Sequence, residues 1–168
     1  MLFNVSQLLR SPVGEARQYA LEPEPPVHSG TAELVRTPGG VLVTVHADVV
    51  LDAACSRCLT PFGYPAHIDF DEIFVQQFDA VTGARIDPED GEDEEAFRIG
   101  QNHLIDIREA VRQYSEMATA MQPLCRPDCP GLCPECGQDL SVGGCRCERT
   151  PLDTRWSALA ALKQTLHG

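Results

Sequence analysis

The cysteines of this chain are grouped in patterns typical of metal binding. Six of the eight fall between residues 125 and 147, and the other two form a C-x-x-C pair, Cys55 and Cys58, far upstream. Four thiolates around one ion are the ligand set of a closed tetrahedral zinc site. Eight cysteines divide evenly into two such sets. We therefore predict two structural sites, with Zn²⁺ as the cofactor of both.

One group of four cysteines is complete without any distant ligand. Cys133 and Cys136 form a C-x-x-C pair, and the residue after them is Gly137. A zinc knuckle turns tightly around its two sulfurs, and a glycine after the second cysteine permits the positive φ of that turn. Two further glycines can reverse the chain toward a final C-x-C pair. We call this predicted zinc site the local site, and its ligands are Cys133, Cys136, Cys145 and Cys147.

The remaining cysteines form two pairs that are incomplete alone. The simplest prediction is one shared zinc site, called here the bridging site, that joins the loop after a long strand to the end of a helix. Its ligands are Cys55, Cys58, Cys125 and Cys129. In a second partition, one site consists of Cys125, Cys129, Cys133 and Cys136, and the other of Cys55, Cys58, Cys145 and Cys147. We favour the first because it keeps the local site intact, and zinc counts in variants that lack one pair would distinguish the two.

Two catalytic interpretations of the cysteines are weaker. A thioredoxin-like redox pair needs a helix that starts at its first cysteine and lowers the thiol pKa. Pro61, Gly63 and Pro65 follow the first C-x-x-C pair closely and disfavour a helix there. A catalytic zinc ion needs an open coordination position and a general base, but the chain has no H-x-E or H-E-x-x-H motif. We therefore predict that the protein is not an enzyme, with a thiol oxidoreductase as a less favoured alternative.

The residues before and after the first C-x-x-C pair alternate as in β-strands. Residues 41–51 place valines on one face and polar side chains such as His46 and Asp48 on the other. Further strands are expected at 17–21, 30–36 and 64–74, and a short helix at 5–9. Closely spaced strands favour an antiparallel β meander. The predicted fold class is α+β, with this meander packed against one main helix and followed by the zinc knuckle and a terminal helix.

The main helix is expected at residues 106–121. Asp106 and Glu109 have the spacing of a capping box, and Pro123 stops the helix. The expected core face consists of Ile107, Val111, Tyr114, Ala118 and Met121. A second amphipathic helix fits residues 154–166, with Asp153 as its N-cap. The cysteine-rich segment lies between the two helices, where only metal can hold so few apolar side chains in a fold.

The formal charge of −12 is unevenly distributed. Residues 1–124 hold 8 Lys and Arg against 20 Asp and Glu, whereas residues 125–168 hold 5 against 5. Seven of the carboxylates lie at 87–95, a segment that we expect to be a solvated loop. We predict a β-rich acidic body at 1–124 and a cysteine-rich segment with a C-terminal helix at 125–168. An acidic body repels phosphate backbones and disfavours broad binding of nucleic acid.

The hydropathy of the chain favours a cytoplasmic protein. No basic n-region with a long apolar stretch opens the sequence, and no apolar run approaches the ~20 residues that span a bilayer. A reducing cytoplasm disfavours disulfides and leaves thiolates available for metal. The location therefore agrees with the zinc interpretation of the cysteines.

Five motifs follow one another along the chain in a specific combination. They are Cys55-Ser-Arg-Cys58-Leu after an apolar strand, Ile105-Asp106-Ile107 before the main helix, the cysteine run from Cys125 to Leu140, Cys145-x-Cys147, and Leu152-Asp153-x-Arg155-Trp156 at the final helix. This combination resembles the bacterial YceD-like family, and the similarity covers most of the chain.

The resemblance implies a role in the accumulation of 23S ribosomal RNA and the biogenesis of the large ribosomal subunit. It implies ribosomal proteins, assembly factors or rRNA as partners. The hydropathy and the lack of catalytic motifs predict neither a membrane nor a small-molecule substrate as a partner. The alternative from another class is a zinc-ribbon protein that binds nucleic acid directly. Its contacts would be Arg126, Arg146, Arg149 and Arg155.

Overall fold

The computed structural model describes residues 1–86 and 96–147. The acidic loop expected at 87–95 and the terminal helix expected at 154–166 lie outside the described residues. Within the described part, the protein has an α+β fold with a mostly antiparallel sheet and few helices, as predicted. None of the helices in that part is long and apolar enough to cross a bilayer.

The main sheet has five strands in the order β2-β3-β4-β5-β6. The first four follow one another along the chain and pair antiparallel, which is the predicted meander. The last strand is short and pairs in parallel with β5. The strands are β2 (Ala16–Ala20), β3 (Val27–Thr37), β4 (Gly40–Ala54), β5 (Pro61–Gln76) and β6 (Arg98–Ile99).

Strand β4 has the alternation that its sequence predicts. Its inward side chains Val41, Val43 and Val45 are completely buried, whereas His46 and Asp48 on the opposite face are exposed. Branched side chains such as valine fit the pleated, half-buried surface of a sheet. One face of the sheet therefore lines the core, and the other, called here the outer face, is open to solvent.

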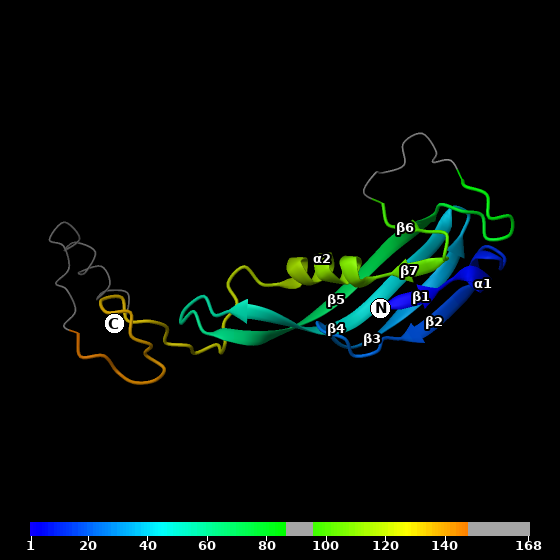
Figure 1. Ribbon diagram of the computed structural model, residues 1–168. Coiled ribbons are helices and arrows are strands. Elements are labelled where there is room, and N and C mark those ends of the chain that lie inside the picture. The colour runs from blue at the N-terminus through cyan, green and yellow to red at the C-terminus, as the bar shows by residue number, and fades with distance from the viewer. Residues whose placement is uncertain (87–95, 148–168) are drawn as a thin grey trace, which may run out of the picture.

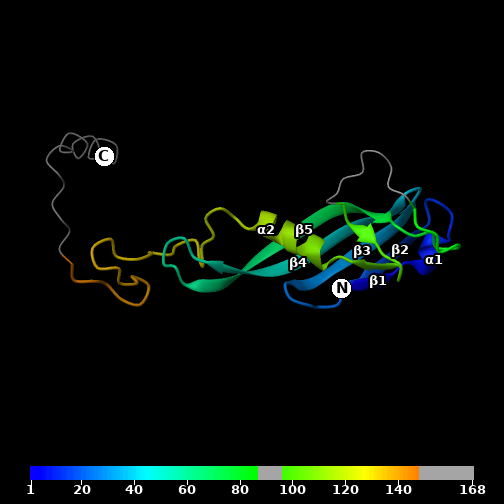
Figure 2. The same ribbon diagram turned by 45° about the horizontal axis from the view of Figure 1, so that its top comes forward.

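A second layer covers the inner face of the sheet (Figures 1 and 2). Helix α2 packs on β5 through Tyr114, whose ring stacks on Phe70 with centroids 4.4 Å apart. The Tyr114 hydroxyl also donates a hydrogen bond of 2.8 Å to the Glu72 carboxylate. The elements of this layer are β1 (Leu2–Asn4), α1 (Ser6–Leu9), β7 (Leu104–Asp106) and α2 (Arg108–Ala118).

Helix α2 begins later than predicted, and the capping box was wrong. The Asp106 carboxylate accepts hydrogen bonds from the backbone N–H and the guanidinium of Arg108, and no side chain caps the helix. Glu109 forms an ion pair with Arg112, one turn further along. The two arginines therefore satisfy the two carboxylates that the capping box would have used.

Helix α2 also ends earlier than predicted. Thr119 has extended backbone, with φ −70° and ψ 124°, and Met121, expected on the core face, is completely exposed. Pro123 favours extended backbone in the residue before it. The Pro123 carbonyl accepts a hydrogen bond of 2.8 Å from the Ser56 N–H. The chain therefore leaves the helix to reach the end of the β4–β5 hairpin.

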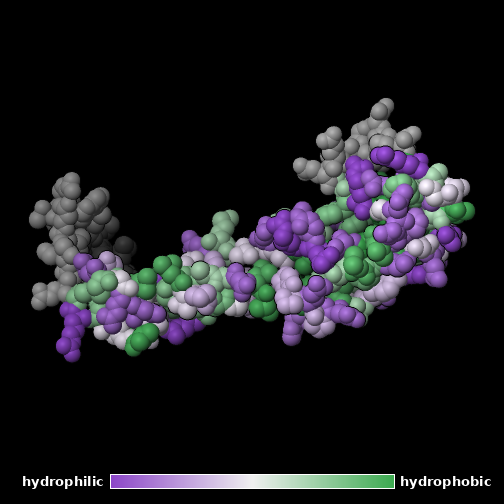
Figure 3. All heavy atoms as spheres, in the orientation of Figure 1, coloured by the Kyte–Doolittle hydropathy of each residue, from purple (hydrophilic) through white to green (hydrophobic). Residues whose placement is uncertain are grey.

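The β4–β5 hairpin extends beyond the rest of the sheet. The pairing of β3 with β4 ends at Val27 and Val49, whereas β4 and β5 remain paired as far as Ala54 and Pro61. We call the two-stranded part at 50–54 and 61–65 the arm. Figures 1 and 3 show that the arm and the cysteine-rich segment form a narrow end of an elongated molecule.

Candidate metal centre

The eight thiols lie in two clusters of four. One cluster joins Cys55, Cys58, Cys125 and Cys129, and the other joins Cys133, Cys136, Cys145 and Cys147. Within each cluster all sulfur atoms lie within 4.8 Å of one another. These are the groups of the bridging site and the local site. The structure does not group the cysteines as in the second partition.

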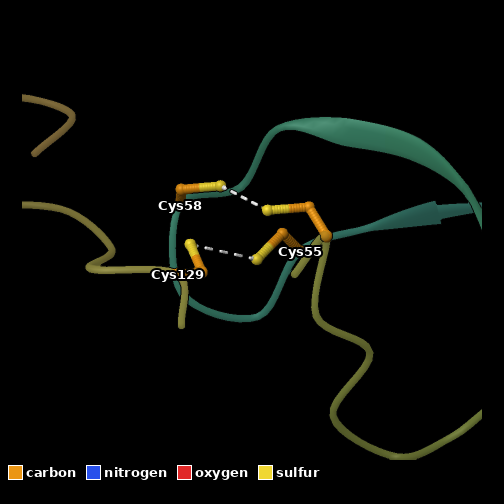
Figure 4. Close-up of side chains that lie close together, drawn as sticks. Cys55, Cys58 and Cys129 are labelled. Carbon is orange, nitrogen blue, oxygen red and sulfur yellow. Dashed lines mark hydrogen bonds between the residues drawn. The ribbon is translucent and has the colours of Figure 1, made fainter. Parts of the chain in front are cut away.

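The bridging site lies at the end of the arm, where the chain that follows α2 meets it. Figure 4 shows the sulfurs of Cys55, Cys58 and Cys129 directed toward a common point. The Cys55 and Cys129 sulfurs are 3.8 Å apart, as are those of Cys58 and Cys125. A tetrahedral ion with zinc–sulfur bonds of about 2.3 Å separates its sulfurs by ~3.8 Å. The spacing of these thiols therefore fits a zinc ion.

Hydrogen bonds of Arg57 hold the two halves of the bridging site together. The Arg57 guanidinium donates a hydrogen bond of 2.9 Å to the Cys129 carbonyl, and the Arg57 carbonyl accepts one of 3.2 Å from the Leu132 N–H. Gly131 has φ +76°, and a Cβ there would lie 3.1 Å from the Arg57 carbonyl oxygen. Arg57 thus positions the second cysteine pair. Its place inside the C-x-x-C motif was the only sequence signal for this role.

Few apolar side chains surround the bridging site. Cys55 and Cys129 are buried, and only Phe62, Leu124 and Leu132 pack against the cluster as partly buried apolar side chains among the described residues. So small a core cannot offset the entropy of ordering the segment. A metal ion held by the four thiols would therefore provide most of the stability at this end of the molecule.

The local site is built on a tight turn. The Gly137 N–H donates a hydrogen bond of 2.9 Å to the Cys133 carbonyl, and Gly137 has the predicted positive φ, +73°. The Cys133 N–H in turn donates to the Gln138 carbonyl at 2.8 Å. The sulfurs of Cys133 and Cys145 are 3.3 Å apart. The local site therefore needs no residue outside the segment 133–147.

Both clusters contain a cysteine whose thiolate is stabilised by peptide N–H groups. Hydrogen bonding from the Cys125 backbone is the main cause that lowers the pKa of Cys55 to about 6. The Cys136 backbone lowers the pKa of Cys133 to about 7 in the same way. Desolvation of the thiol raises the pKa of Cys125 to about 12, although the residue is exposed. A hydrogen bond with the Cys136 thiol raises the pKa of Cys147 to about 12. A divalent cation would stabilise all four thiolates of each cluster, because its charge offsets their mutual repulsion.

The four arginines of the nucleic-acid alternative are only partly described. Arg126 lies 3.5 Å from the Asp128 carboxylate, which partly neutralises its charge. Arg146 is exposed between the last two cysteines. Arg149 and Arg155 lie outside the described residues. The structure therefore describes only two of the four arginines, Arg126 and Arg146.

Histidines and aspartates alternate on the outer face of the sheet. His46 is paired across the strands with Asp69, at 2.5 Å, and Asp48 with His67, at 2.8 Å. His67 Nε2 also lies 3.2 Å from Asp69. The hydrogen bond with Asp48 is the main cause that raises the pKa of His67, and the same bond lowers the pKa of Asp48. His46 is on the strand surface, as predicted, and His67 is on the same surface.

Replacing Asp48 is expected to lower the pKa of His67. The pair stabilises the fold fully between the ordinary pKa values of Asp and His, about 3.9 and 6.5. This contribution falls as pH rises through the raised pKa of His67, and as pH falls through the lowered pKa of Asp48. NMR titration of the His67 ring should show the shift toward 6.5 in Asp48→Asn, and Asp52→Asn is the control. An unchanged His67 pKa in Asp48→Asn would contradict this account.

Comparisons with known proteins match the part of the chain that holds both cysteine clusters. The family model described as "Large ribosomal RNA subunit accumulation protein YceD" matches residues 43–163. Uncharacterized proteins of Mycobacterium tuberculosis and Mycobacterium bovis are each 34% identical over 124 residues, which is 73% of this chain and 56% of the relative. An uncharacterized protein of Mycobacterium leprae is 30% identical over 99 residues, or 59% of this chain and 42% of the relative. The chain spans about half the length of these curated relatives. No solved structure matches the chain significantly.

Proposed function

Because the chain belongs to the YceD family of large ribosomal RNA subunit accumulation proteins, we propose that it is a zinc-stabilised accessory factor in 23S rRNA accumulation. In this proposal it acts during biogenesis of the large ribosomal subunit, in the cytoplasm, and is not an enzyme. The observation that carries the proposal is the family match at residues 43–163, which includes every cysteine of both sites.

The convergence of four thiols in each cluster supports a structural role for the metal. An ion held by four protein ligands has no vacant position for a substrate or an activated water. Thiolate ligands in a tetrahedral set favour zinc over harder cations such as Mg²⁺ or Ca²⁺. Bound zinc would supply charge neutralisation and cross-linking, and the residues of this chain would supply the partner surfaces.

The charge of the outer face supports basic proteins as partners in place of naked RNA. No Lys or Arg stands at the outer-face positions of β3, β4 and β5, all of which are described. The carboxylates on this face are Glu33, Asp48, Asp52, Asp69 and Asp71. An acidic surface attracts basic polypeptides and repels phosphate backbones. Ribosomal proteins or assembly factors with basic segments therefore fit this surface better than rRNA does.

Depletion of the protein in the bacterium that encodes it tests the proposed function. The ratio of large-subunit to small-subunit rRNA is expected to fall on depletion, measured by quantitative electrophoresis of total RNA. A plasmid copy of the wild-type chain should restore the ratio, whereas Cys55→Ser/Cys58→Ser should not, because the arm would lose its link to the segment after α2. An unchanged ratio after complete depletion would contradict the proposal.

A further inference from the structure

The two C-x-x-C turns of the protein have the same backbone geometry but are followed by different residues. The Leu59 N–H donates to the Cys55 carbonyl at 2.8 Å, just as the Gly137 N–H donates to the Cys133 carbonyl at 2.9 Å. Both residues have positive φ, 62° at Leu59 and 73° at Gly137. Leu59 thus occupies the position in the bridging site that glycine occupies in the local site.

Leucine is poorly suited to this conformation. A side chain with positive φ crowds its own backbone, and only glycine, and to a lesser degree asparagine, adopts it readily. The glycine of the local site is not required for lack of room, because a Cβ at Gly137 would meet no atom within 4 Å. The two turns therefore differ in backbone strain. Leu59 is strained by its positive φ in the bridging site, whereas Gly137 adopts the same conformation without strain in the local site.

Burial of the Leu59 side chain does not offset the strain. Leu59 is 65% exposed, and it is not among the apolar side chains that pack against the bridging cluster. A single exposed leucine would need no explanation by its exposure alone. A leucine that is both strained and exposed is different, because neither its conformation nor its packing stabilises the folded chain. Residues held in unfavourable backbone conformations concentrate at functional positions.

Hydrogen bonds on both sides of Leu59 fix the backbone that carries its side chain. The turn that carries it is closed by its own hydrogen bond to Cys55, and Arg57 ties the same turn to Cys129. The turn follows β4 at the end of the arm, the narrow part of the molecule in Figures 1 and 3. An apolar side chain on a rigid backbone loses less entropy when a partner covers it than one on a mobile loop, because only the side chain has to be ordered.

We propose that Leu59 is an anchor that inserts into an apolar pocket of a protein partner at the end of the arm. This inference rests on the proposed function, and the partner is then a protein of the large subunit or of its assembly. A leucine side chain has no charge, no hydrogen-bonding group and no aromatic face, which are the features that bind RNA. It fits the apolar pockets at the centre of protein interfaces, where anchor residues are buried on binding.

Variants at position 59 separate this anchor from a structural role. Leu59→Asn and Leu59→Gly both suit the positive φ, so each should keep two zinc ions per chain and a Tm within about 4 °C of the wild type, or above it. Binding to large-subunit precursor particles purified from the same bacterium should weaken about tenfold or more. Val81→Asn is the matched control, because Val81 is 77% exposed in the turn after β5, at the other end of that strand from the arm. A clear loss of zinc or of Tm in both position 59 variants would show a structural residue and overturn the inference.

A photoreactive leucine analogue at position 59 identifies what covers the side chain. Irradiation with the precursor particles should give an adduct that protease removes and RNase does not, and the analogue at position 81 should give none. An adduct with RNA alone, or equal binding of Leu59→Asn and the wild type, would overturn the anchor but leave the proposed function standing. A wild-type chain that binds no particles would overturn the proposed function and the anchor with it.

Discussion

Replacing Cys55 and Cys58 together with serine is expected to remove one of two zinc ions and to release the segment after α2 from the arm. The bridging site joins residues far apart in the sequence, and closing so long a loop without a cross-link is entropically unfavourable. Structural zinc contributes about 10–16 kcal/mol of apparent binding free energy near neutral pH. The three apolar side chains around this cluster cannot replace that contribution.

Zinc per chain, measured by mass spectrometry of the metal, checks this prediction. Cys55→Ser/Cys58→Ser and Cys125→Ser/Cys129→Ser should each lose the same single ion, because both pairs belong to one cluster. Hydrogen exchange should increase at 119–132 in both variants and remain slow in β4 near Val45, which is completely buried.

The local site provides the matched comparison. Cys145→Ser/Cys147→Ser should also lose one ion, but the bonds between the arm and the segment after α2 should persist, since they involve only bridging-site neighbours such as Arg57. Combining this pair with Cys55→Ser/Cys58→Ser should leave no zinc. If the combined variant kept one ion, the two clusters would not be the metal sites that we predict.

The pattern of β4 shows why much of the fold could be predicted from the sequence. Val41, Val43 and Val45 alternate with polar residues over a long run, and the period of two fixes both the strand and its buried face. β1, β6 and β7 have two or three residues each, so no periodicity can reveal them. Their existence depends on partners far along the chain, such as Ile105 opposite Phe3.

The candidate site was predictable to the extent that its chemistry is local. The spacing of the cysteines around Gly137 predicts the local site directly. The four cysteines that are left over then form the bridging site. The contacts of Arg57 were not predictable, because they form only after the chain returns from α2. The strained φ of Leu59 was also hidden, since the sequence shows a leucine where glycine would have indicated the turn.

Truncation of Phe74 is expected to destabilise the body of the protein without changing its metal content. Phe74 is 2% exposed on the inner face of β5, and its ring stacks on Phe97 with centroids 5.1 Å apart. Replacing a buried phenylalanine by alanine costs about 3–5 kcal/mol, from lost burial and the cavity left behind. Total stabilities are only about 5–15 kcal/mol, so this loss is a large fraction of the whole.

Ile73, the residue before Phe74, provides the matched control. Ile73 is on the same strand but on the outer face, 54% exposed, so Ile73→Ala should change the unfolding free energy by no more than about 1 kcal/mol. Urea denaturation followed by far-UV circular dichroism measures both variants. Each should retain two zinc ions, because the clusters lie beyond the sheet core and share no side chain with it. A loss of zinc in Phe74→Ala under native conditions would show that the body and the cysteine-rich end fold as one unit, and that the metal sites depend on the core of the sheet.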